Sequence, residues 1–239
     1  MFMKKRIWEL DAFRGLCILG MLFVHICFDL LVFGILEPGT VTATIYTLLS
    51  QWGGILFFLI SGICVTLGHH PIKRGLQVFG CGLLCTAATL GMYLAGIMGR
   101  MIIIYFGVLH CLGICMLLWP VLRKSPTRLV IGLSVLCIGI GFWLRECRAE
   151  HYGWVWLGIM PHGFITSDYY PILPNLGYFL AGIALGKTLY RHKESLFPRV
   201  NPQNPLIRFL SFFGTYSLPI YILHQPLIYG LFFLVAMIL

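Results

Sequence analysis

The chain has 239 residues, of which 59% are hydrophobic and only 10% are charged, and its formal net charge is +9. Soluble domains carry about 25% charged residues, so this composition indicates a polytopic membrane protein. No polar stretch is long enough to build a separate soluble domain, and we expect none. The positive charge does not indicate nucleic acid as a partner, because the Lys and Arg residues cluster in the connections between apolar runs.

Apolar runs of membrane-spanning length follow one another along the whole chain. An open sheet cannot satisfy its backbone hydrogen bonds in lipid, so we expect every run to be a helix. The sequence therefore predicts an all-α bundle of about seven transmembrane helices, folded as a single domain over residues 1–239. The predicted spans are approximately 12–33, 44–68, 75–98, 101–121, 128–144, 170–190 and 214–238.

The distribution of positive charge between the two ends of these spans predicts the orientation. Thirteen of the seventeen Lys and Arg residues fall at one set of ends. Arg100, Arg145 and Arg148 fall at the other, and Arg14 lies within the first span. By the positive-inside rule, the N-terminus is cytoplasmic and the C-terminus lies outside.

The first span carries four ionisable residues on one face, here called the polar stripe: Asp11, Arg14, His25 and Asp29. Arg14 and His25 are eleven positions apart, which is about three helical turns and about 16 Å along the axis. Ionisable groups inside a span are rare and usually functional. The structural alternatives are interfacial snorkelling for Arg14, pairing with Arg14 or with the helix N-terminus for Asp11, a hydrogen-bonded core position for His25, and a helix-end position near the outer interface for Asp29. The stripe must face a cavity, a pore or a partner helix.

Two later spans carry polar groups that match the stripe. His110 lies in the middle of IYFGVLHCLG, and His224 lies beside Gln225 in SLPIYILHQPLIYG. Each histidine, taken alone, also fits a hydrogen-bonded core residue. Three embedded histidines together with Arg14 indicate a polar cavity.

The outer connections offer two more candidates, His162 and Asp168, close to the start of the sixth span. A plain outer loop is the alternative for that segment. The nine cysteines lie almost entirely within the predicted spans, and no CxxC is present. We therefore predict neither a metal site nor a disulfide framework.

The first helix, LDAFRGLCILGMLFVH, resembles the opening helix of the transmembrane acyltransferase superfamily, in which acyltransferase-3 proteins carry an arginine, ten residues and a histidine. The chain as a whole more closely resembles the heparan-α-glucosaminide N-acetyltransferase catalytic-domain family and its bacterial relatives. The resemblance rests on five blocks in the same order: RIWELDAFRGL (6–16), FFLISGI (57–63), IYFGVLHCLGI (104–114), SDYYPILPNLGYFLAGIALG (167–186) and SLPIYILHQPLIYG (217–230).

This resemblance implies an enzyme of a bacterial plasma (inner) membrane. It would take an acetyl group from cytoplasmic acetyl-CoA and deliver it to an amine or hydroxyl of a sugar or glycan on the other side. The phosphates of CoA need positive charge at the cytoplasmic mouth, where suitable residues are available. The expected donor-binding residues are Arg14, Lys73, Arg74 and Arg123.

The expected catalytic group contains His25 as general base and Asp29 as the carboxylate that orients its ring. His110, His224 or Gln225 would stabilise the developing oxyanion. In the animal lysosomal members an amide takes the place of His25, so this chain follows the acyltransferase-3 pattern here.

Asp168 and His162 would hold the acceptor at the outer mouth. Other expected partners are membrane lipids and, as a common assembly, a second copy of the chain.

Two other classes of function compete with this prediction. A proton-coupled transporter or exporter would use the His25/Asp29 pair as a relay. Such proteins favour inverted repeats, and we find none in the sequence. A scaffold protein without turnover would leave the polar stripe unexplained.

Overall fold

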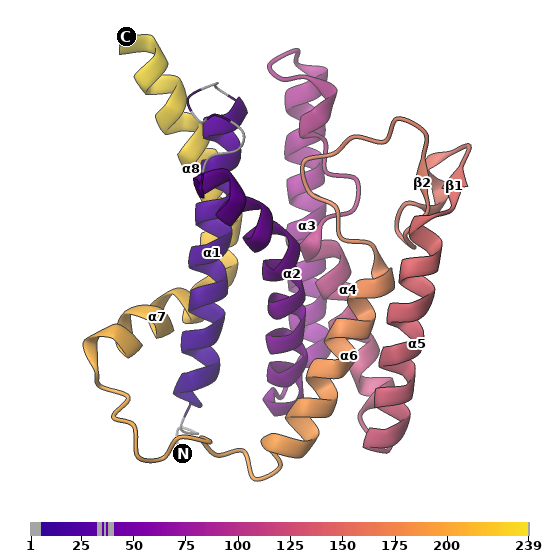
Figure 1. Ribbon diagram of the computed structural model, residues 1–239, viewed down its shortest axis with the longest axis vertical. Helices are drawn as coiled ribbons and strands as arrows, with labels where there is room; N and C mark the ends of the chain where they lie inside the picture. Colours follow the sequence, from indigo (N-terminus) through magenta and orange to yellow (C-terminus); the bar gives the residue numbers. More distant parts are fainter. Residues whose placement is uncertain (1–5, 33–34, 36, 38–40, 239) are drawn as a thin grey trace. The chain divides into compact units, whose positions relative to one another are not determined.

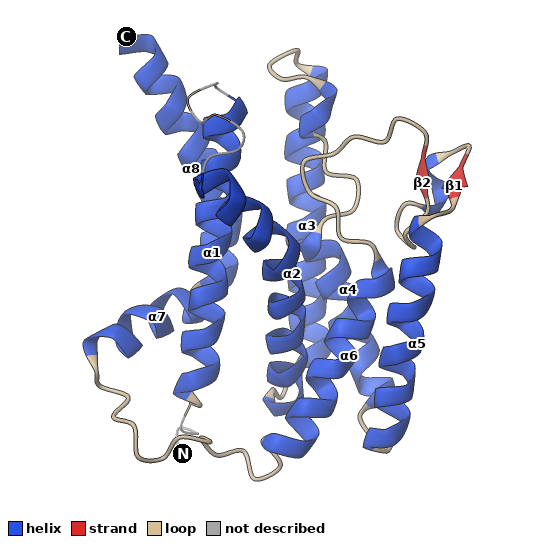
Figure 2. Cartoon of the chain, in the orientation of Figure 1, coloured by secondary structure: helices blue, strands red, loops and turns tan. Residues whose placement is uncertain are grey.

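A computed structural model of the chain describes residues 6–32, 35, 37 and 41–238. Most of the described residues lie in helices and very few in strands, which confirms the all-α prediction (Figure 2). The α-helices are α1 (Trp8–Val32), α2 (Val41–Leu67), α3 (Pro71–Leu94), α4 (Val108–Leu122), α5 (Thr127–Arg145), α6 (Ile172–Leu189), α7 (Pro205–Thr215) and α8 (Ser217–Ile238). Two 3₁₀ turns, η1 (Arg100–Ile102) and η2 (Tyr152–Trp154), and a parallel pair, β1 (Arg148–Ala149) and β2 (Met160–Pro161), complete the described elements.

Each predicted span contains a helix, but not every helix has the predicted length. Five described helices are long and apolar enough to cross a membrane, or six if the bent pair α7–α8 counts as one. The predicted span 101–121 is the exception, because α4 begins only at Val108 and has 15 residues. At 1.5 Å per residue it is about 22 Å long, shorter than the roughly 30 Å hydrocarbon core. The first predicted span ends at residue 33, outside the described residues.

The chain folds as two compact units. Unit 1 combines Met1–Phe57 with Lys193–Leu239, and unit 2 is Phe58–His192. Unit 1 contains α1, the first part of α2, α7 and α8 (Figure 1). Unit 2 contains the rest of α2 and α3 to α6. That the whole chain acts as one domain stays a prediction.

In unit 1, α7 crosses α1 at a pair of glycines. A Cβ on Gly15 would lie 1.8 Å from the carbonyl oxygen of Leu210. A Cβ on Gly214 would lie 1.8 Å from the carbonyl oxygen of Asp11. Only hydrogen side chains allow the two backbones to approach this closely, as in small-residue helix contacts in membranes.

The predicted spans 170–190 and 214–238 leave residues 191–213 as a connection, but α7 makes the last nine of these residues helical. Asn204 accepts a hydrogen bond from the backbone N–H of Leu206 at 3.0 Å, and Pro205 is the first helical residue. Both are helix-start signals. The helix is bent by 80° relative to α8.

Unit 2 uses the same close packing at several crossings. A Cβ on Gly62 of α2 would lie 2.1 Å from the carbonyl oxygen of Phe179 in α6. Between α5 and α6, the Ser134 hydroxyl donates to the carbonyl oxygen of Gly177 at 2.7 Å. The helices α3 and α4 are antiparallel neighbours, since Gly82 approaches His110 and the more N-terminal Gly75 approaches Leu117.

Hydrogen bonds fix the connection between α5 and α6 against the segment before α4 and against the start of α6. The N–H of Tyr170 donates to the carbonyl oxygen of Phe106 at 3.0 Å. The N–H of Ile172 donates to the carbonyl oxygen of Trp156 at 2.8 Å. This end of unit 2 is therefore built from paired backbone rather than from an open loop.

Candidate active site

The first half of the polar stripe lies against α7. Arg14 Nη1 is 3.5 Å from the carbonyl oxygen of Gly214, near the C-terminal end of α7, and 3.7 Å from Asp11 Oδ1. The Asp11 carboxylate also pairs with Arg6, whose Nε is 3.1 Å from Oδ2. A guanidinium at a helix C-terminus interacts favourably with the carbonyls and the dipole there. Asp11 and Arg14 thus stabilise the α1–α7 crossing.

The second half of the stripe lies against α8. The rings of His25 and His224 are in contact, with centroids 4.6 Å apart and planes inclined by 59°. His224 is only 7% exposed. The sequence left a cavity, a pore or a partner helix as the surroundings of the polar stripe. The structure shows a partner helix against both halves, α7 against the first and α8 against the second.

The tautomer of His224 follows from its backbone contact. Its Nδ1 lies 2.5 Å from the carbonyl oxygen of Tyr221, which can only accept a hydrogen bond. In the neutral ring, Nδ1 therefore carries the hydrogen and Nε2 carries the lone pair. Nε2 is buried and has no hydrogen-bond partner among the described residues. His224 thus presents an unused acceptor.

Asp29 is joined to α8 through Gln225. Asp29 is 2% exposed, and Gln225 Nε2 donates to Oδ1 and Oδ2, both at 3.3 Å. The reverse amide orientation would place two acceptors together, so this one is preferred. The amide oxygen Oε1 of Gln225 is then a second buried atom without a partner among the described residues. A buried acceptor atom without a partner is costly. A hydrogen-bond donor from a bound molecule would therefore stabilise both atoms.

His110 has both ring nitrogens engaged. The N–H of Gly107 donates to Nδ1 at 3.2 Å, so Nε2 carries the hydrogen and lies 3.3 Å from the hydroxyl of Thr86. That hydroxyl in turn donates to the carbonyl oxygen of Ile104 at 2.7 Å. A histidine satisfied on both sides and only 4% exposed fits a structural cap of α4.

Asp168 is placed at the same helix end. Its Oδ2 accepts a hydrogen bond from the N–H of Val108, the first residue of α4, at 3.0 Å. A Cβ on Gly107 would lie 2.1 Å from this oxygen, so glycine is required for the contact. A carboxylate at a helix N-terminus is stabilising. His162 is exposed, in the turn after β2.

Three of the four predicted phosphate ligands belong to unit 2. Lys73 and Arg74 are exposed in the first turn of α3, and Arg123 is exposed at the end of α4. Because α3 and α4 are antiparallel, these three cations lie at one end of the unit. Arg14, the fourth, belongs to unit 1. No group of His, Cys, Asp and Glu in the described part of the chain could hold a metal ion.

Sequence reasoning did not find α7 or its contact with Arg14. The signal was available in NPLIRFLSFFGT (204–215), where an N-cap asparagine and a first-turn proline precede an apolar run. The contact of His25 with His224 and that of Asp29 with Gln225 join residues about 200 positions apart, which no local pattern reports.

The fold and the buried polar groups define the class of protein. It is an integral membrane protein of apolar helices, in which a histidine pair and an aspartate–glutamine pair lie between α1 and α8. The family model for heparan-α-glucosaminide N-acetyltransferase, catalytic, matches residues 6–226, so the chain belongs to that family. No curated protein and no solved structure gives a match. The family is one of transmembrane N-acetyltransferases, which places the chain among acetyltransferase enzymes.

Proposed function

We propose that the protein moves an acetyl group from cytoplasmic acetyl-CoA to an amine or hydroxyl of an extracytoplasmic sugar or glycan, in a bacterial plasma membrane. The match over residues 6–226 carries this proposal. The buried acceptor atoms on α8 support it, because acyl transfer needs a group that takes a proton from the attacking atom.

By the positive-inside rule, the donor would bind at the helix ends that are rich in Lys and Arg. Lys73, Arg74 and Arg123 are exposed there and can pair with the phosphates of CoA. Arg14 still has N–H donors besides the Nη1 group that faces Gly214. The four cations are therefore the proposed donor-binding residues.

The histidine pair is the proposed acid–base group. As the amine nitrogen or hydroxyl oxygen of the acceptor bonds to the acetyl carbon, its proton passes to an imidazole nitrogen. The carbon–sulfur bond of the thioester breaks, and the thiolate of CoA takes a proton from the imidazolium. His224 Nε2 offers the lone pair for the first transfer, and His25, at 4.6 Å between centroids, is the adjoining base.

The aspartate–glutamine pair is proposed to orient the reacting groups. Because Asp29 accepts from Gln225 Nε2, the free group of Gln225 is its Oε1 acceptor. This oxygen fits an N–H or O–H of the acceptor better than an oxyanion. The same reasoning favours His224 as a base over His224 as an oxyanion donor.

The test is turnover of acetyl-CoA by protein in nanodiscs, measured as release of free thiol with and without a panel of amino sugars. We expect release that depends on the sugar, and a fall of about 10²- to 10⁴-fold in His25→Ala and His224→Gln with donor binding retained. His192→Ala, an exposed histidine outside the spans, is the matched control.

Failure of acetyl-CoA to bind at millimolar concentration would overturn the proposal. A proton flux that depends on His25 would then favour the transporter. Equal turnover in all three variants would remove the histidine pair from the chemistry and leave the enzyme class intact.

A further inference from the structure

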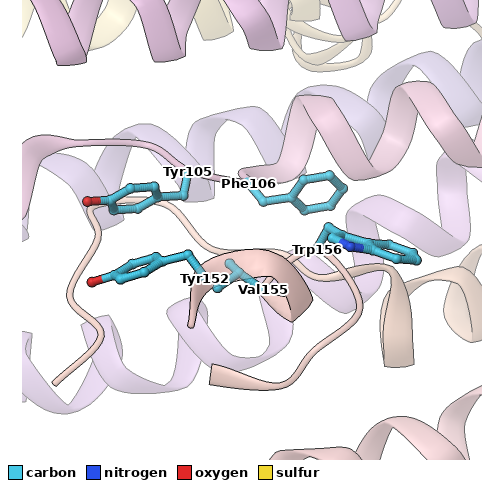
Figure 3. A pocket seen from close by; sticks show the side chains of 5 residues that line it. All are labelled: Tyr105, Phe106, Tyr152, Val155 and Trp156. Atoms are coloured by element: carbon cyan, nitrogen blue, oxygen red, sulfur yellow. The ribbon is translucent and has the colours of Figure 1, made fainter. Parts of the chain in front are cut away.

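Unit 2 contains a second feature that the donor and the histidine pair do not use: an aromatic pocket of about 190 Å³ between the segment before α4 and the turn η2. The side chains of Tyr105, Phe106, Tyr152, Val155 and Trp156 line it. In Figure 3 the two tyrosine rings lie on one side with their hydroxyls pointing the same way, and Phe106 and Trp156 lie on the other.

We propose that this pocket binds one pyranose ring of the acceptor glycan, a ring that carries no positive charge. The inference rests on the proposed function, since it names the kind of sugar that the enzyme would hold. Sites that enclose drug-sized ligands measure about 300–1,000 Å³, so this pocket suits a single ring rather than the long CoA donor.

The chemistry of the lining supports a sugar. The faces of aromatic rings are electron-rich, and the C–H bonds on one face of a pyranose are weakly positive, so the two surfaces attract. Trp156 is 44% exposed and offers an open indole surface, whereas Phe106 and Val155 are buried. The hydroxyls of Tyr105 and Tyr152 point away from Phe106 and Trp156 and lie at the edge of this apolar lining, where they can supply the few polar groups that orient a ligand (Figure 3).

Arg100 determines which sugars fit. Its Nη2 donates to the hydroxyl of Tyr152 at 2.6 Å, and its guanidinium carbon lies 5.7 Å from the centre of that ring. Hydrogen bonding to Tyr105 holds the pKa of Arg100 above its ordinary value. The guanidinium keeps further N–H donors for sugar hydroxyls, but its charge disfavours a protonated amine. The bound ring therefore carries no positive charge, and a reacting amine would belong to another unit of the glycan.

Hydrogen bonds hold the segments that line the pocket in place. Each of its two walls is hydrogen-bonded to the segment 170–172. The N–H of Tyr170 donates to the carbonyl oxygen of Phe106, and the N–H of Ile172 donates to the carbonyl oxygen of Trp156. The Tyr169 hydroxyl donates to the carbonyl of Val155 at 2.9 Å. Aromatic residues that only anchor a protein in the membrane interface do not need such a hollow.

The chain offers a matched control in Trp154. It is 46% exposed, lies in η2 two residues before Trp156, and is absent from the pocket lining. Saturation-transfer NMR would measure binding of methyl glucoside to the full-length protein in nanodiscs, without acetyl-CoA. Sorbitol, which has hydroxyls but no ring, is the negative ligand.

We expect methyl glucoside to bind and sorbitol not to bind, with methyl glucosaminide weaker at neutral pH. Trp156→Ala should weaken binding about tenfold, whereas Trp154→Ala should stay within about twofold. Trp156→Phe retains a ring and should recover most of the affinity, provided that thermal melting shows all variants folded.

Equal binding of methyl glucoside by wild type and Trp156→Ala, or equal signals from methyl glucoside and sorbitol, would overturn the site. Sugar-dependent acetyl-CoA turnover together with that result leaves the proposed function standing. Binding lost only in Trp156→Ala, in a protein that never consumes acetyl-CoA, would support the site and count against the proposed function.

Discussion

Replacing Asp168 with alanine separates two roles that its carboxylate can have. As an acceptor ligand it would affect the use of sugar and leave stability unchanged. As the cap of α4, through its bond to the N–H of Val108 at 3.0 Å, it would affect stability first. The geometry favours the cap.

The size of the loss follows from the buried contact. Val108 is 5% exposed, so water cannot easily replace the lost acceptor. Loss of a helix cap costs about 0.5–2 kcal/mol, and an unsatisfied buried N–H costs about 1–3 kcal/mol. We therefore expect Asp168→Ala to cost about 1–3 kcal/mol. In domains of this size 1 kcal/mol lowers Tm by about 2–4 °C. Asp168→Asn keeps an oxygen acceptor and should lose only the charge–dipole part, about 0.3–1 kcal/mol.

The assay is thermal unfolding in nanodiscs, followed by acceptor kinetics at a temperature where every variant is folded. Glu150→Ala, an exposed carboxylate in the same connection, controls for loss of charge. If Asp168→Ala melts like wild type while its KM for the acceptor rises, the cap assignment is wrong and the carboxylate belongs to the acceptor site.

Three further outcomes are expected. Gly62→Val should abolish folded protein in a solubility and gel-filtration test, because a Cβ would meet the Phe179 carbonyl at 2.1 Å; Gly80→Ala, with nothing within 4 Å, should be tolerated. Burial raises the pKa of Tyr169 from its ordinary 10.0 to about 12. Its contribution to stability should therefore be complete below pH 10 and be lost as the pH rises toward 12, and melting curves of wild type and Tyr169→Phe should show the difference. Asn204→Ala should cost about 1 kcal/mol through loss of the α7 cap, seen as faster limited proteolysis of that helix.

The spans were predictable because apolar length is a local property of the chain. The membrane thickness sets it, and each predicted run contains a helix. The boundaries of α4 were not predictable in the same way. Residues 101–107 are as apolar as the helix that follows, but here the backbone pairs with the connection before α6, as between Phe106 and Tyr169. Composition cannot report that pairing.

The candidate site was predictable as a set of residue types and not as a set of contacts. Helical spacing placed His25 and Asp29 on one face of α1. It could not show that Asp29 pairs with Gln225 rather than with His25, because that choice depends on how α8 packs. His110 gave the same local signal as His224, an isolated histidine in an apolar run. Only the hydrogen bonds distinguish a satisfied cap from an imidazole with an unused lone pair.

The order of the polar stripe along α1 explains why one helix carries so many ionisable groups. Near its start, Arg14 holds the end of α7, and α7 is separated from α8 by a single residue, Tyr216. This hydrogen bond to the carbonyl oxygen of Gly214 thus limits where α8 can begin, and so where His224 and Gln225 meet His25 and Asp29. Loss of Arg14 would therefore disturb the histidine pair as well as any bound phosphate. An Arg14→Lys variant keeps the charge and loses the planar fork. If the contact with α7 is the larger part of the role of Arg14, this variant should retain most of its affinity for CoA but lose turnover.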